Sequence, residues 1–289
     1  MGISRLRALD CFQSDDLIGI GIEADAIRRR LHPEEVVTYS CVTVLDAVAA
    51  VNRGSLVEAA FTGATVRLTS ASGKLESLVE GCRVLRQLFS SEWIEVSISG
   101  SLLMGIDADA AVALLVEAGA TAIFVDPRSD SGDYAAAQTA ALMLHRAACK
   151  RDMQTVATIP FGCGESIEER LDFLEAIRRL QDQTGGFVAC LPLGLDALGG
   201  RELDGVTAVE RLKMTAITRM YLDNIPHLRS VQTGAGLKVL QTALRFGADD
   251  AELRVPHSGA TEQDLRRIIR DSGFQPVERD QNYSMMFLN

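Results

Sequence analysis

Side chains that could bind a ligand or do chemistry gather where short β-branched runs of the sequence end. One such run is followed by Asp126, Arg128, Asp130 and Asp133, and three carboxylates with one guanidinium could hold a cation or a polar ligand. Cys163, a candidate nucleophile, and Glu165 follow another run, in a Gly-x-Gly turn before a helix start where backbone N–H groups can receive an anion. The candidate ligand-binding groups are Asp126, Arg128, Cys163, Glu165, Gln232, Arg254 and His257.

Each of these groups also has a simpler structural interpretation. The polar residues after Asp126 and around His257 are typical of solvated loops, and the Glu165 carboxylate would repel an anion at the glycine turn. No histidine can be paired with Cys163 from the sequence, and the histidines show neither H-E-x-x-H nor H-x-x-E-H spacing. The sequence therefore predicts no metal site and leaves the catalytic residues unknown.

Cysteine spacing and charge exclude further classes. The closest cysteines, Cys149 and Cys163, are fourteen positions apart, whereas zinc ribbons and iron–sulfur loops need clustered thiolates. Lys and Arg number 29 against 39 Asp and Glu, a net charge of −10 that disfavours a nucleic-acid partner. No stretch reaches the roughly 18 apolar residues of a membrane span, and the first residues hold no signal core. We expect a cytoplasmic protein without a membrane partner.

The elements that position these groups follow a regular alternation. From residue 36 onward, eight β-branched runs alternate with stretches of helical periodicity; the runs begin at Val36, Thr65, Ile94, Thr121, Thr155, Gly186, Leu228 and Ala251. Their spacing of about 31 residues matches that of a closed (β/α)8 barrel. We therefore predict an α/β protein with a TIM-type barrel over 36–289; an open doubly wound sheet is the alternative. Residues 1–35 are expected to form a short helical cap on the barrel floor.

Three segments resemble one enzyme family. They are DLIGIGIEADAIRRRLHPEEVVTY from Asp16, TVATIPFGCGESIEERLDFLEAIRRLQDQTGGFVACLPL from Thr155 and ITRMYLDNIPHLRSVQTGAGLKVLQTALRFGADD from Ile217. These segments resemble the radical S-adenosylmethionine enzymes of the futalosine route to menaquinone, which include dehypoxanthine futalosine cyclase and aminofutalosine synthase. The resemblance implies a radical-SAM-like barrel, a four-iron four-sulfur cluster and S-adenosylmethionine.

The chain departs from the family pattern where the cofactor would bind. After its first strand the family carries C-x3-C-x2-C, whose three thiolates hold the cluster, whereas this chain has Cys41 alone. The family's glycine-rich segment after the second strand is replaced by TSASGKLE, and Cys163 stands where the resemblance implies a histidine. We therefore expect no cofactor and no radical activity, although the scaffold is retained.

Three hypotheses follow. The first is a cluster-less pseudoenzyme, a binding or partner protein in or beside the pathway, recognising a nucleoside metabolite or the active pathway enzyme. The second is a repurposed enzyme that uses the same barrel mouth for non-radical chemistry. The third is an active radical enzyme whose cluster is held by Cys41, Cys163 and Cys190 meeting at the barrel mouth.

Overall fold

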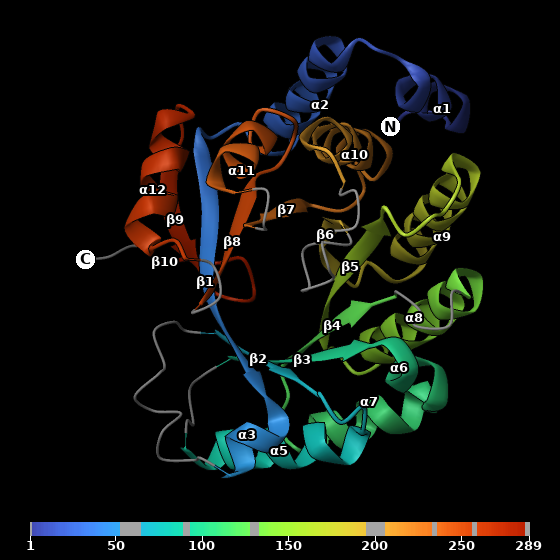
Figure 1. Cartoon of the computed structure of the whole chain (residues 1–289), viewed down its shortest axis with the longest axis vertical. Helices are drawn as coiled ribbons and strands as arrows, with labels where there is room; N and C mark the ends of the chain where they lie inside the picture. Colours follow the sequence, from blue (N-terminus) through green and yellow to red (C-terminus); the bar gives the residue numbers. More distant parts are fainter. Residues whose placement is uncertain are drawn as a thin grey trace.

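The computed structural model describes residues 2–52, 65–88, 93–127, 133–194, 206–232, 236–255 and 259–286 (Figure 1). Within these residues, eight parallel strands stand where the sequence predicts them: β1 (Val36–Asp46), β2 (Thr65–Thr69), β3 (Trp93–Ser99), β4 (Ala122–Asp126), β5 (Gln154–Phe161), β6 (Phe187–Gly194), β7 (His227–Val231) and β8 (Asp250–Val255). Each strand pairs with the next, and β1 also pairs with β8. This last pairing closes the sheet into a barrel and excludes the open-sheet alternative.

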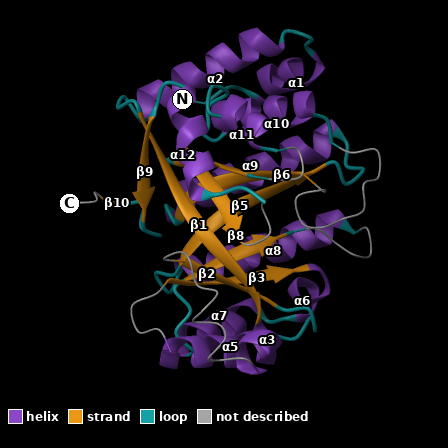
Figure 2. Ribbon diagram, turned by 60° about the vertical axis from the view of Figure 1, so that its left-hand side comes forward, coloured by secondary structure: helices purple, strands orange, loops and turns teal. Residues whose placement is uncertain are grey.

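Helices surround the barrel (Figure 2): α3 (Ala47–Asn52), α5 (Leu75–Leu88), α6 (Gly100–Gly105), α7 (Ala108–Glu117), α8 (Tyr134–Cys149), α9 (Ile167–Thr184), α10 (Ala208–Tyr221), α11 (Leu237–Ala243) and α12 (Glu262–Asp271). Helix α9 begins with the capping box of Ser166 and Glu169 that its sequence predicts. Apolar side chains between strands and helices form two large buried clusters. None of the helices in the described part of the chain has the length and apolar character that crossing a membrane requires.

The N-terminal segment forms two helices, α1 (Arg5–Gln13) and α2 (Leu17–Leu31). Helix α2 packs along α10, and α1 contacts α9 and α10, so the segment covers the outer helix layer. Arg28 is buried, donates to Asp25 and lies 4.6 Å from the ring centroid of Phe274. After α2 the chain reaches the amino-terminal end of the barrel at His32.

Two C-terminal strands extend the sheet beyond the predicted eight. Strand β9 (Gln275–Arg279) pairs in parallel with the first residues of β1, and β10 (Met285–Met286) pairs antiparallel with β9. Between them, Tyr283 is half-buried and its hydroxyl bonds with Asp250 and Arg229. The C-terminal segment thus fills the amino-terminal end of the barrel.

Candidate functional site

The carboxyl ends of the strands carry several of the predicted groups. Asp126 is the last residue of β4 and is buried, and Arg254 is buried near the end of β8. Gln232 directly follows β7, and its backbone N–H donates to the carbonyl oxygen of Glu252. Arg128 and His257 lie outside the described residues. The barrel topology therefore brings Asp126, Gln232 and Arg254 to the same end of the molecule, as the sequence predicts.

The glycine turn after β5 is held by its own glutamate. The carboxylate of Glu165 accepts hydrogen bonds from the backbone N–H groups of Gly162, at 2.9 Å, and Cys163, at 2.7 Å. It also accepts one from Nε of Arg170, at 2.6 Å. Gly162 has φ +78°, a conformation that glycine adopts without strain. Because Glu165 already binds these amides, its carboxylate stabilises the turn before α9, whose N-cap is Ser166, and it contacts Cys163 through the Cys163 backbone N–H.

Below the mouth, the barrel interior holds a buried network of charges. Glu252 of β8 accepts two hydrogen bonds from the guanidinium of Arg67, at 2.7 and 2.8 Å, and one from Arg229 at 2.8 Å. Nε of Arg254 donates to the same carboxylate at 3.0 Å. Burial by itself raises the pKa of Glu252, but the three arginines outweigh burial and hold that pKa well below its usual range. The barrel interior thus holds a network of paired charges beside an apolar cluster that includes Phe124, Leu191 and Leu193.

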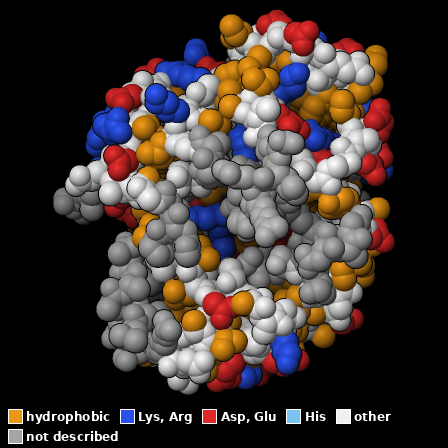
Figure 3. All heavy atoms as spheres, viewed as in Figure 1, with side chains coloured by type: hydrophobic (Ala, Val, Ile, Leu, Met, Phe, Trp, Pro, Cys, Tyr) orange, Lys and Arg blue, Asp and Glu red, His pale blue; other side chains and the backbone are white. Residues whose placement is uncertain are grey.

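The network contacts the predicted site through Phe124 of β4. The guanidinium of Arg67 lies 4.2 Å from the Phe124 ring centroid, so this ring faces the interior. Asp126 is two residues further along the same strand and therefore points to the same side, toward the mouth. Arg67 also pairs with Glu95 of β3. Basic side chains come to the surface near the centre of the face shown in Figure 3.

The thiols do not meet at the mouth. Cys41 and Cys190 lie in the apolar layer between strands and helices, and burial raises the pKa of each to about 12. Cys163 is half-buried in the turn after β5. The third hypothesis, a cluster bound by these three cysteines, is therefore wrong, because alternate residues of a strand face opposite sides and Cys41 and Cys190 face outward.

Two open pockets lie at the rim of this end. One, of about 320 Å³, is lined by Phe12, Glu165, Ile167, Arg170, Glu210 and Lys213. The other, of about 390 Å³, is lined by residues at the start of α5, in α6 and at the start of α7, among them Lys74, Glu76, Leu102 and Asp107. Both adjoin helix N-termini, where the positive end of the helix dipole favours anionic groups. The mouth thus offers room for a small polar molecule at its edge.

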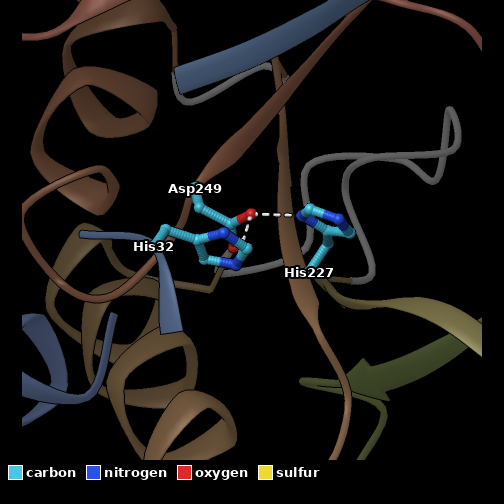
Figure 4. Close-up of side chains that lie close together, drawn as sticks. All are labelled: His32, His227 and Asp249. Atoms are coloured by element: carbon cyan, nitrogen blue, oxygen red, sulfur yellow. Dashed lines mark hydrogen bonds and ion pairs between the residues drawn. The ribbon is translucent and has the colours of Figure 1, made fainter. Parts of the chain in front are cut away.

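A further group of titratable side chains, which no sequence pattern indicates, lies at the opposite end of the barrel. His32, His227 and Asp249 precede or open β1, β7 and β8 (Figure 4). Burial raises the pKa of Asp249, but Arg219 and His227 outweigh it and lower that pKa to about 2. No local spacing could reveal this group, because the three residues come from three separate connections that only the closed barrel brings together.

Comparison with known structures supports the fold. No protein-family profile matches the chain. Methylornithine synthase superposes with a TM-score of 0.67, covering 96% of this chain and 94% of that chain at 12% identity. This likeness establishes the fold and confirms the predicted closed parallel barrel.

Curated relatives extend the comparison to sequence. Aminodeoxyfutalosine synthase of Thermus thermophilus is 37% identical over 160 residues, covering 49% of this chain and 43% of that protein. Cyclic dehypoxanthine futalosine synthase of Streptomyces coelicolor is 33% identical over 151 residues, covering 47% of this chain and 37% of that protein. Over about half its length, the chain is therefore similar to aminodeoxyfutalosine synthase and cyclic dehypoxanthine futalosine synthase, which confirms the resemblance. The matches span less than half of either relative.

Proposed function

We propose that this chain is a cluster-less relative of the futalosine-pathway enzymes that binds a pathway nucleoside at its barrel mouth without radical chemistry. The observation that carries the proposal is the segment after β1, where the resemblance places the three cluster cysteines. Strand β1 ends at Asp46 and runs directly into α3. Asp46 accepts hydrogen bonds from the backbone N–H groups of Val48 and Ala49, and so caps this helix.

The thiolates present do not fit an iron–sulfur cluster. A four-iron four-sulfur cluster of this family needs three thiolates on one short loop. The sequence from Asp46 to Gly81 contains no cysteine, and Cys41 faces the helix layer. The same Asp46 accepts from the N–H of Ala71 after β2, at 2.8 Å, which ties two mouth loops together through a carboxylate. These hydrogen bonds of Asp46 support the proposal that the segment after β1 begins a helix rather than a cluster-binding loop.

The mouth has the polar groups that a nucleoside would need. A ribose offers hydroxyl donors, which the inward-facing carboxylate of Asp126 could accept, and a base offers acceptors for a guanidinium. Arg254 supplies such a guanidinium on β8, the strand that the closed barrel places across the interior from β4. A binding protein needs these groups in fixed positions, and the ion pair of Arg254 with Glu252 fixes one of them.

Iron content tests the cluster-less half of the proposal. The purified full chain is reconstituted anaerobically with iron and sulfide, and its iron and its cleavage of S-adenosylmethionine are measured. We expect no stoichiometric iron and no cleavage. About four irons per chain together with cofactor cleavage would overturn the proposal.

Calorimetry and thermal shift test the ligand half. Dehypoxanthine futalosine, aminofutalosine and S-adenosylmethionine are titrated into the chain, and we expect saturable binding of one of the nucleosides. Asp126→Asn should weaken that binding about 10-fold or more, because a charged acceptor is lost. Asp109→Asn is the matched control, since Asp109 is exposed on α7 and pairs with Arg151. An equal loss of nucleoside affinity in both variants, or no nucleoside binding by the wild type, would contradict a site at the mouth. Turnover of a nucleoside in the absence of iron would instead favour the repurposed enzyme.

A further inference from the structure

The amino-terminal end of the barrel holds a histidine–carboxylate cluster that the mouth does not use. Oδ2 of Asp249 lies 2.6 Å from Nδ1 of His227 and 3.2 Å from Nε2 of His32. The carbonyl oxygen of Pro226 lies 2.8 Å from the same His32 nitrogen. Figure 4 shows the two imidazoles on either side of the Asp249 carboxylate. Two nitrogens and two oxygens, all ordinary metal ligands, are therefore gathered here.

We propose that His32, His227 and Asp249 bind a divalent transition-metal ion of the zinc type, with the Pro226 carbonyl as a fourth ligand. Imidazole nitrogens with one carboxylate suit zinc and its first-row neighbours, whereas calcium and magnesium prefer all-oxygen sites. Among the described residues, this is the one group of three histidine, cysteine or carboxylate side chains whose ligand atoms lie within 4.8 Å of one another.

The ligand atoms must shift by about 1 Å to bind one ion. Tetrahedral zinc bonds of about 2.0–2.2 Å place two ligands of one ion about 3.3–3.6 Å apart. The ligand atoms of the three side chains lie within 4.8 Å of one another, and side-chain rotations can bring them to this separation. The ion replaces the protons that now join the imidazoles to Asp249, and each neutral imidazole then carries its proton on the other nitrogen.

Neighbouring groups hold the ligands in position. The second oxygen of Asp249, Oδ1, accepts from Arg219 at 2.5 Å and from the backbone N–H of Leu228 at 2.7 Å, which leaves Oδ2 facing the imidazoles. The His227 ring stacks between those of His32, at 4.8 Å, and Tyr283, at 4.0 Å. These contacts fix the carboxylate and one ring before any metal arrives.

Charge and exposure set the expected affinity. The side chain of His32 is 21% exposed and that of His227 is 18% exposed, so an ion can reach both from solvent. The Asp249 side chain is 3% exposed. The Arg219 cation opposes a second positive charge, and its guanidinium donates to the carbonyl oxygens of Gly247, Ile225 and Pro226, the last of which is the proposed fourth ligand. We expect a dissociation constant on the order of 10 µM, weaker than thiolate zinc sites.

The metal would join three connections of the fold: the one from α2 to β1, the one before β7 and the one before β8. These connections lie at the amino-terminal end of the strands, where barrel residues contribute to stability rather than catalysis. Binding should therefore raise the melting temperature by about 5 °C at saturating zinc. It should leave nucleoside binding at the opposite end unchanged.

Metal titration of the full chain tests the proposal. EDTA-treated protein is titrated with Zn²⁺ by calorimetry and with Co²⁺ by visible absorption. His32→Gln and His227→Asn keep an amide that can still hydrogen-bond Asp249 but remove the imidazole ligand. His145→Asn is the matched control, because Nδ1 of His145 bonds Thr155 away from the cluster.

We expect one equivalent of Zn²⁺, ligand-field bands of bound Co²⁺, and at least 10-fold weaker binding in both cluster variants, with the control unchanged. In the wild type, Zn²⁺ should also protect His32 and His227 from modification by diethyl pyrocarbonate, which is read by peptide mass and needs no variant. Absence of saturable binding at millimolar Zn²⁺, unchanged affinity in both variants, or no protection would each overturn the proposal.

Discussion

Glu252 is the group on which the charged barrel interior depends. Four hydrogen bonds from three arginines converge on this carboxylate, and its side chain is fully buried. Glu252→Gln keeps the shape and leaves no cavity, but it leaves Arg67, Arg229 and Arg254 without their shared anion. Removing one partner of a buried ion pair costs about 3–5 kcal/mol. We therefore expect the free energy of unfolding to fall by that amount.

Urea unfolding followed by far-ultraviolet circular dichroism measures this change, with equal m values showing that the comparison is valid. Glu210→Gln is the matched control, because the Glu210 side chain is 36% exposed and pairs with Arg170 at 2.9 Å. Glu210→Gln should lower the free energy of unfolding by less than about 1 kcal/mol. If Glu252→Gln costs no more than Glu210→Gln, the argument that the interior is held by charge is refuted.

Acidification gives an independent measure of the same carboxylate. The arginines hold the folded-state pKa of Glu252 well below its usual range, despite burial. Its contribution to stability is therefore full above the unfolded-state pKa of about 4.3 and is lost as pH falls toward the folded-state pKa. Wild type should lose more stability than Glu252→Gln between pH 5 and pH 3. Parallel pH profiles of the two proteins would contradict the assignment.

Two further changes test the backbone and the thiols. Gly247→Ala should lower the free energy of unfolding by about 2–3 kcal/mol, because φ is +99° and the new Cβ would lie 2.9 Å from Cβ of Arg219. Gly185→Ala should lower it by only about 1 kcal/mol, because φ is +63° but nothing lies near the new Cβ. Equal unfolding free energies for the two variants would remove the steric argument. Iodoacetamide at pH 8 should label Cys163 but not Cys190 in the folded protein, because burial raises the pKa of Cys190 to about 12. Peptide mass spectrometry reads the label, and rapid labelling of Cys190 would contradict its placement.

The positions and contacts of the candidate residues at the barrel mouth were only partly predictable from the sequence. The sequence places Asp126, Glu165 and Arg254 after or near strand ends, and the structure keeps Asp126 and Arg254 at the mouth. It shows Glu165 bound to its own turn. A carboxylate two or three residues from glycine amides can accept from them or face a ligand, and spacing alone does not separate these outcomes.

The sequence by itself determined the eight strands, their order and the capping box of α9, because strand alternation and helix capping depend on residues close together in the chain. The sequence also established that the cysteines are not clustered, because this follows directly from their spacing along the chain. Only the tertiary structure decided which way Cys41 faces, that Arg67 from β2 reaches Glu252 on β8, and that His32 meets Asp249. The physical reason is barrel closure: the pairing of β1 with β8 brings together side chains about 200 positions apart, and no local pattern encodes those contacts.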